Sequence, residues 1–127
     1  MQLLLDTHAL LWWLAGDRRL SAAARRAIEN DDNVIFVSAA SAWEISTKHR
    51  LGKLDASAIA GRLGALIASQ GFEPLNMTVN HAERAGMLPG EHRDPFDRML
   101  AAQAQAGDLT LVTNDEVFGG YGVRTRW

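Results

Sequence analysis

The sequence predicts one α/β domain with a mostly parallel central sheet that is covered by helices on both faces. Short apolar segments alternate along the chain with longer segments in which apolar residues recur at helical spacing, and this alternation is typical of a parallel sheet. One segment, residues 34–37, reads Val-Ile-Phe-Val without polar alternation, as strands buried on both faces do. A chain of 127 residues has the commonest size of a single domain, so we expect one domain over residues 1–127.

The first half of the chain is predicted to contain two strands and three helices. The apolar residues that follow Met1 end at Asp6, which indicates a short buried strand. Gly16 is placed to end the helix after that strand, while Ser21 and Ser38 are suitable N-caps for the next two helices. The expected elements are strand 2–5, helix 7–15, helix 22–29, strand 34–37 and helix 39–50.

The second half continues the alternation of helices and strands. Gly71 ends one apolar helical pattern, Pro95 occupies the first position of another, and Gly107 lies at the exit of that second helix. The expected elements are helix 56–70, strand 72–76, helix 78–87, a loop over 89–94, helix 95–106, strand 109–112 and a short edge strand over 123–126. The sheet should therefore contain four or five strands.

The composition is that of a folded protein without disulfides. The chain is 47% hydrophobic and 22% charged, and it contains no cysteine, which fits a reducing cytoplasm and excludes thiolate zinc sites. The amino terminus lacks the basic segment of a signal peptide, and the longest apolar stretch is too short to span a membrane, so we expect a cytoplasmic protein. The net charge of −2 gives no sign of a nucleic-acid partner. If four acids are assigned to a metal site, however, the remaining surface is slightly basic, which is compatible with RNA.

Two acidic residues follow apolar strands at the edge where open α/β sheets bind ligands. Asp6 directly follows the first predicted strand, and Asp115 follows Thr113 and Asn114 after the strand at 109–112. Ligands of such sheets bind outside the carboxyl ends of the strands. Glu44 and Asp97 lie on helices that are expected to start at the same edge. Together the four acids are candidates for a site that binds magnesium or manganese, because these ions prefer carboxylate oxygens.

Each of these acids also has a purely structural explanation. Asp6 is a suitable N-cap, and Glu44 precedes Lys48 by four residues, which favours a surface ion pair. Asp97 belongs to a helix start in which Asp94 is the N-cap, and Asp115 could cap a turn over 116–118. Taken one at a time, the acids leave both explanations open. Their common location is what favours a site.

Other reactive residue types offer no competing site. The four histidines lack metal-binding spacing, and we interpret His8 and His92 as ordinary polar residues; the set is His8, His49, His81 and His92. Three tryptophans are interpreted as core or interface residues: Trp12, Trp13 and Trp43. Because two adjacent tryptophans cannot share one side of a helix, one of them is available for a partner surface.

Four blocks of the sequence resemble the PIN domain of VapC-type toxins. The blocks are Leu5-Asp6-Thr7-His8-Ala9-Leu10-Leu11-Trp12, Ser41-Ala42-Trp43-Glu44-Ile45-Ser46 with Lys48-His49-Arg50-Leu51-Gly52-Lys53-Leu54, His92-Arg93-Asp94-Pro95-Phe96-Asp97-Arg98-Met99-Leu100-Ala101-Ala102-Gln103-Ala104, and Leu111-Val112-Thr113-Asn114-Asp115. They span nearly the whole chain in the expected order. No acidic position departs from the pattern.

The resemblance implies a PIN-like three-layer sandwich and a magnesium- or manganese-dependent endoribonuclease, the toxin of a type II toxin–antitoxin pair. By analogy, Asp6 and Asp97 would be the principal metal ligands, while Glu44 and Asp115 would complete the acidic pocket and orient the attacking water. The polar groups of Thr113 and Asn114 would support them. The family also implies a homodimer, with higher toxin–antitoxin assemblies, and a small antitoxin whose C-terminal segment lies along a groove. We expect the helices that carry Trp12, Trp13 and Trp43 to form that groove.

Three other functions were considered from the residues. A phospho-receiver domain, also a magnesium-binding α/β protein, would need adjacent acids after the first strand and a lysine after the last, whereas this chain has a single Asp6 and no lysine near Asp115. A haloacid-dehalogenase-type phosphatase would need Asp-x-Asp, but the chain reads Asp6-Thr7-His8. A catalytically silent PIN fold that only binds a partner stays open, although four intact acids argue against it.

Overall fold

A computed structural model describes residues 1–127 and confirms the predicted α/β class. Five strands form one sheet with the order β3-β2-β1-β4-β5, and every neighbouring pair is parallel. The strands are β1 (Gln2–Leu5), β2 (Val34–Ser38), β3 (Glu73–Leu75), β4 (Thr110–Val112) and β5 (Thr125–Arg126). The prediction was four or five strands. The sheet has five, because the edge segment near the carboxyl terminus pairs with β4.

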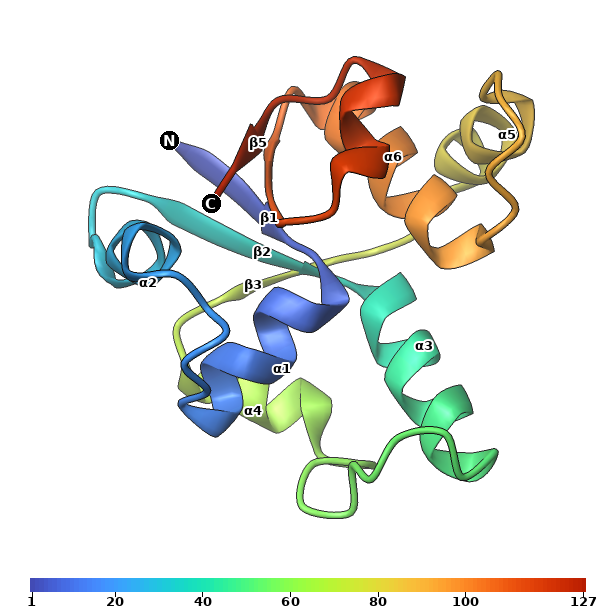
Figure 1. The fold of residues 1–127 in the computed structure, drawn as a ribbon. Coiled ribbons are helices and arrows are strands. Elements are labelled where there is room, and N and C mark those ends of the chain that lie inside the picture. Colours follow the sequence, from blue (N-terminus) through green and yellow to red (C-terminus); the bar gives the residue numbers. More distant parts are fainter.

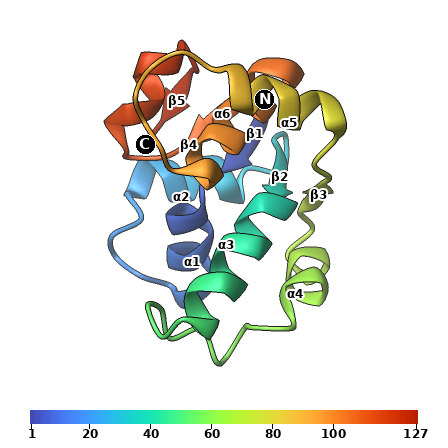
Figure 2. The ribbon, with the colours of Figure 1, turned by 90° about the vertical axis from the view of Figure 1, so that its right-hand side faces the viewer.

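Helices cover both faces of the sheet and complete a three-layer arrangement (Figure 1). They are α1 (Thr7–Ala15), α2 (Ala22–Glu29), α3 (Ala39–Arg50), α4 (Leu63–Ser69), α5 (Val79–Met87), α6 (Pro95–Gly107) and the short 3₁₀-helix η1 (Glu116–Tyr121). In Figure 1, α1, α2 and α4 lie below the sheet, and α5 and α6 lie above it. Figure 2 shows α3 running beside α1 on the side of the molecule where the strands end. None of these helices is long and apolar enough to cross a membrane.

The central strand β1 joins two hydrophobic cores. Leu3 and Leu5 point into the core formed with α1, α2 and α4, whereas Leu4 points into the core formed with α6 and η1. All three side chains are completely buried. A strand that is buried on both faces has no solvent-exposed side, so its sequence does not alternate between apolar and polar residues. This explains the continuous apolar sequence of β1.

The strand order reverses between β1 and β4. The chain first proceeds outward from β1 to β2 and β3, and then returns to the other side of β1 to form β4 and β5. Such a reversal separates the connections that leave two neighbouring strands, and ligands of open α/β sheets bind in the crevice that results. Asp6 follows β1 and Thr113 follows β4, so both lie at this crevice.

Local capping signals predicted the helix starts correctly. The side chains of Asp6, Ser21, Ser38 and Asp94 accept backbone hydrogen bonds at the starts of α1, α2, α3 and α6. These caps depend on residues two or three positions apart, which is why the sequence alone reveals them.

Three predicted helices have different bounds in the structure. The helix expected over 78–87 starts one residue later, because Thr78 is its N-cap. The helix expected over 56–70 is confined to α4, because Gly61 adopts a left-handed conformation with φ +79° and interrupts the pattern. The helix expected over 95–106 continues through Gly107 and ends at Asp108, which takes the left-handed position with φ 51°. The Leu109 side chain lies against Gly107, where an added Cβ would be 3.2 Å from it.

Candidate active site

Asp6 is a buried carboxylate whose two oxygens are held by different elements. Its Oδ1 accepts a hydrogen bond from the backbone N–H of Ala9 at 2.7 Å, which caps α1, and its Oδ2 accepts one from the hydroxyl of Thr113 at 2.5 Å. Burial raises the pKa of Asp6; the hydrogen bonds from Thr113 and Ala9 oppose this change, and the nearby charge of Asp115 adds to it. Asp6 is therefore both an N-cap and a carboxylate that the fold keeps in an unfavourable environment.

Thr113 connects Asp6 to Asp115. While its hydroxyl donates to Asp6, the same oxygen accepts a hydrogen bond from the backbone N–H of Asp115 at 3.0 Å. The exposed Asp115 side chain accepts from the N–H of Val117 at 3.0 Å and so caps η1. Asn114 is also exposed, and its side chain makes no hydrogen bond within the chain. Thr113 thus holds Asp6 directly, whereas Asn114 has no such contact.

Glu44 lies on α3 and is buried, with only 4% of its surface exposed. Its Oε1 accepts a hydrogen bond from the Thr7 hydroxyl at 2.6 Å, and its Oε2 accepts one from Nζ of Lys48 at 2.5 Å. The hydrogen bond to Glu44 raises the pKa of Lys48, and the charges of Asp94 and Asp97 add to this effect. The ion pair suggested by the spacing therefore exists, but it is not a surface pair, because its acidic partner is buried.

Asp97 occupies the first turn of α6 and is half-buried. Its Oδ2 lies 2.9 Å from Nε2 of His92, at the end of the preceding loop. Burial raises the pKa of Asp97; the hydrogen bond with His92 opposes the change, and the charges of Asp94 and Glu44 reinforce it. Asp94 fills the capping role itself, because its Oδ1 accepts from the N–H groups of Phe96 and Asp97.

The four predicted acids influence one another through their charges. The charge of Asp115 acts on Asp6, and the charge of Glu44 acts on Asp97 together with that of Asp94. No three histidine or acidic side chains lie close enough together to hold one metal ion. The sequence analysis expected all four acids in one site, and both that common site and the assignment of the four residues to catalysis or metal binding stay predictions.

The donor set itself suits a hard divalent cation. All four candidates offer carboxylate oxygens, the ligands that magnesium and manganese prefer. One oxygen of Asp97 and one of Asp115 make no hydrogen bond within the chain. Burial and like charge disfavour the ionised forms of Asp6 and Asp97, and a bound cation would relieve both effects.

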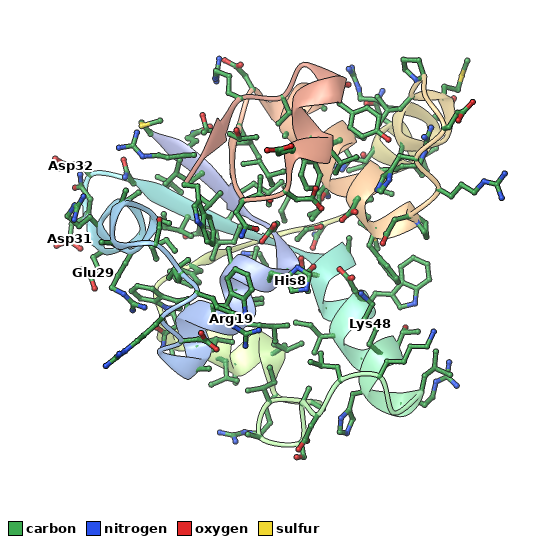
Figure 3. The ribbon with its side chains drawn as sticks, viewed as in Figure 1. His8, Arg19, Glu29, Asp31, Asp32 and Lys48 are labelled. Atoms are coloured by element: carbon green, nitrogen blue, oxygen red, sulfur yellow. The ribbon has the colours of Figure 1, made fainter.

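A cavity of about 530 Å³ opens beside Glu44, between α1, α3 and the segment after α3. Its lining includes Thr7 and Glu44 together with apolar and basic side chains, among them Leu11, Trp12, Ile45, Leu54, Lys48 and Lys53. Figure 3 labels His8 on α1 and Lys48 on α3, the two helices that border the cavity.

The two helices that were expected to form the antitoxin groove, α1 and α3, border this cavity, but only one of their three tryptophans lines it. Trp12 lines the cavity, but Trp13 does not. Instead, Trp13 packs against Phe72 with ring centroids 6.1 Å apart. Trp43 is 55% exposed and packs edge-on against Phe96. Adjacent helical residues point in different directions, which explains why Trp12 and Trp13 are separated.

Sequence reasoning predicted the contact of Lys48 with Glu44 but missed two residues that position the acids. Thr7 holds Glu44, and His92 holds Asp97. Arg98 contributes indirectly, because its guanidinium donates to the backbone carbonyls of Ala85, Leu88 and His92 and so fixes the loop before α6. Only the Lys48 contact had a local signal, the four-residue spacing from Glu44. The others depend on how distant elements or an irregular loop pack.

Comparison with known proteins agrees with this architecture. The model of the PIN domain matches residues 3–122. The chain is 33% identical over 114 residues to Ribonuclease VapC22 of Mycobacterium tuberculosis, an alignment that covers 88% of this chain and 85% of the relative.

Solved structures share the fold at lower identity. VapBC2 from Rickettsia felis, bound to a DNA fragment from its promoter, has a TM-score of 0.73 and 18% identity, covering 99% of this chain and 98% of that one. VapC20 of Mycobacterium tuberculosis, a toxin that cleaves the sarcin-ricin loop, has a TM-score of 0.68 and 20% identity, covering 95% of each chain. A toxin–antitoxin complex from Klebsiella pneumoniae has a TM-score of 0.61 and 25% identity, covering 89% of this chain and 86% of that one. The family model and the VapC relative together establish that the chain belongs to the PIN-domain family, among the VapC-type proteins.

Proposed function

We propose that this chain is a magnesium- or manganese-dependent endoribonuclease and the toxin of a type II toxin–antitoxin pair. The observation that carries the proposal is the buried carboxylate of Asp6 at the strand-order reversal. The charge of Asp115 acts on Asp6, and the charge of Glu44 acts on Asp97, which supports including the other three acids. The similarity to Ribonuclease VapC22 supports the choice of RNA as substrate.

In this proposal, Asp6 and Asp97 are the principal ligands of the cation, and Glu44 and Asp115 complete the acidic pocket. When bound, a divalent cation lowers the pKa of water and neutralises charge on the phosphate. The chain's contribution is to fix the carboxylates. Ala9 and Thr113 orient Asp6, and His92 orients Asp97.

Glu44 is suited to a second task besides completing the metal site. Both of its oxygens already accept hydrogen bonds, from Thr7 and Lys48, so its position is fixed by two elements. A carboxylate held in this way beside the cavity can orient an attacking water and accept a proton from it.

The proposed protein partner is a small antitoxin with an amphipathic segment. Apolar residues of α1, α3 and the following segment line the cavity next to Glu44, and its charged residues include both signs: Arg19, Lys48, Lys53, Asp17, Glu44 and Asp55. A helix or extended segment with an apolar face would complement the apolar part of this lining. The similar structures from Rickettsia felis and Klebsiella pneumoniae are complexes, which supports such a partner.

We also propose that the protein is a homodimer. Several large apolar side chains are exposed on α3, on α5 and just before α5: Trp43, Met77, Val79 and Met87. Burial of these side chains against a second copy would remove apolar surface from water. Light scattering of the purified chain should give twice the chain mass, and a monomer at micromolar concentration would contradict this part of the proposal.

The metal requirement can be tested on the purified chain without antitoxin. Single-stranded and structured RNA should be cleaved with magnesium or manganese, and cleavage should stop when EDTA is added in excess. Undiminished cleavage in EDTA would refute the metal dependence. No cleavage under any metal condition would favour the alternative of a catalytically silent PIN-fold binding module. The absence of three closely spaced metal-binding side chains is compatible with that alternative.

The toxin role needs a separate experiment in cells. Expression of the chain alone should arrest growth, and co-expression of the adjacent gene should restore it. If the lone chain is harmless while its RNA-cleaving activity is intact, the toxin assignment is wrong.

A further inference from the structure

We propose that Lys48 competes with the divalent cation for Glu44 and thereby sets the cation affinity of the acidic site. This inference rests on the proposed metal dependence. It concerns a residue of this chain that directly contacts one of the candidate acids, and it assigns that residue a positioning role and not a catalytic one.

The first observation is the contact itself. Nζ of Lys48 donates to Oε2 of Glu44, one turn away on α3, and the buried glutamate has no other charged partner at hydrogen-bond distance. A carboxylate removed from water requires a compensating charge, and Lys48 supplies it. A divalent cation approaching Glu44 meets this ammonium group first, and the two positive charges repel each other.

The second observation is the position of Lys48 between two elements. Besides Glu44 on α3, the charges of Asp94 and Asp97 at the start of α6 act on Lys48. The ammonium therefore lies in the field of Glu44 and Asp97, not of Glu44 alone. Its removal should act mainly through Glu44, the acid that it contacts.

The third observation is that Asp6 and Asp115 lack such a partner. Asp6 accepts hydrogen bonds from a hydroxyl and a backbone amide, and Asp115 accepts from a backbone amide. Neither forms a salt bridge. The site is thus electrostatically asymmetric, and the asymmetry is created mainly by Lys48, with His92 as the second basic neighbour of Asp97.

The fourth observation is that Lys48 is more exposed to solvent than Glu44. Its side chain is 37% exposed and borders the cavity, whereas the Glu44 side chain is only 5% exposed. The flexible stem of a lysine can swing its charge into solvent without disturbing the backbone. Cation binding at Glu44 therefore requires movement of Lys48, not of Glu44.

The test is calorimetric titration of manganese into the purified full-length chain. Lys48→Gln keeps a hydrogen-bond donor near Glu44 but removes the charge, and it should bind manganese about tenfold more tightly because the repulsion is gone. Lys48→Arg retains the charge and should keep the wild-type affinity. Lys53→Gln is the matched control, because Lys53 borders the same cavity without an ion pair, and it should also bind like the wild type.

Thermal melting in EDTA and in manganese gives an independent readout. Lys48→Gln should melt lower than the wild type in EDTA, because a buried carboxylate loses its charged partner. On addition of manganese, its melting temperature should rise more than that of the wild type does. Should Lys48→Gln not fold, the double variant Glu44→Gln/Lys48→Gln, with no charge in the pair, is compared with Glu44→Gln. The manganese affinities of these two variants should then differ by less than tenfold. Without the charge of Glu44, there is no carboxylate for which Lys48 competes with the cation.

The outcomes separate this inference from the proposed function. Manganese binding to the wild type with unchanged or weaker binding to Lys48→Gln would overturn the role of Lys48 and leave the metal dependence intact. A difference of tenfold or more between the double variant and Glu44→Gln would overturn it as well. Absence of manganese binding to the wild type would overturn both.

Discussion

Asp94 and Asp97 lie three residues apart at the start of α6, and substitution to asparagine should separate their roles. Asp94 is a structural cap, because its Oδ1 accepts from the N–H groups of Phe96 and Asp97 at 2.9 and 3.1 Å. Asparagine caps a helix about as well as aspartate, so Asp94→Asn should melt near the wild-type temperature. Asp94→Ala removes both hydrogen bonds and should lower the free energy of unfolding by about 0.5–2 kcal/mol. For a domain of this size, that corresponds to a melting temperature lower by roughly 2–10 °C.

Asp97→Asn should behave in the opposite way. Burial and the charges of Asp94 and Glu44 disfavour the ionised carboxyl, whereas the hydrogen bond with His92 favours it. Asparagine removes the repulsion and can still accept a hydrogen bond from Nε2 of His92. Without metal, this variant should melt at the wild-type temperature or higher. With metal, its RNA cleavage should fall by orders of magnitude, because the charge that attracts the cation is lost.

The assay combines melting in EDTA with single-turnover RNA cleavage in manganese, for both asparagine variants and for Asp94→Ala. Normal cleavage by Asp97→Asn together with a lower melting temperature would show that Asp97 is only part of the helix start. A large loss of activity in Asp94→Asn at unchanged stability would refute the assignment of Asp94 to capping alone.

Three further perturbations test the structure of the site and its surroundings. Thr113→Val removes the hydroxyl that joins Asp6 to the Asp115 backbone. In urea denaturation, it should lower the free energy of unfolding by about 1–3 kcal/mol, whereas Thr113→Ser should be about as stable as the wild type. The folded-state pKa of Asp6 is raised, so the stability linked to its protonation is present below the unfolded pKa and is lost as pH rises through the folded pKa. In EDTA, the stability of Asp6→Asn relative to the wild type should therefore increase as the pH rises above the unfolded pKa of about 4, and a constant difference would contradict the burial argument. The hydroxyl of Tyr121 is buried without a hydrogen-bond partner, so Tyr121→Phe should leave the melting temperature unchanged or raise it, and a clear decrease would mean that the hydroxyl has a partner in solution.

The parts of this fold that the sequence predicts well are those fixed by neighbouring residues. Caps such as Asp6 and Asp94 act over two or three positions, and continuous apolar strands reflect burial on both faces. The strand order is different, because it depends on which strands meet after the chain has folded. Capping and periodicity therefore placed Asp6 and Asp115 at one sheet edge without showing that β1 and β4 are neighbours.

The contacts within the site also divide into those that sequence spacing indicates and those that depend on packing. The Glu44–Lys48 pair is visible from its spacing, but the burial of Glu44 follows from the packing of α1 against α3 and has no local signal. The contact of His92 with Asp97 depends on a loop that Arg98 fixes through backbone carbonyls. A single glycine, Gly61, was enough to make a predicted helix wrong, since its left-handed conformation is permitted to glycine and is not imposed by the pattern.

The central claim is that the carboxylate at the end of β1 takes part in metal-dependent RNA cleavage. The most direct test is single-turnover cleavage in manganese by Asp6→Asn, with Asp31→Asn as the charge-matched control on the turn between α2 and β2, remote from the site (Figure 3). Both variants lose one negative charge, and asparagine at position 6 can still cap α1. We predict that Asp6→Asn stays folded and loses cleavage by orders of magnitude, while Asp31→Asn cleaves like the wild type. Equal cleavage by the two variants would contradict the account.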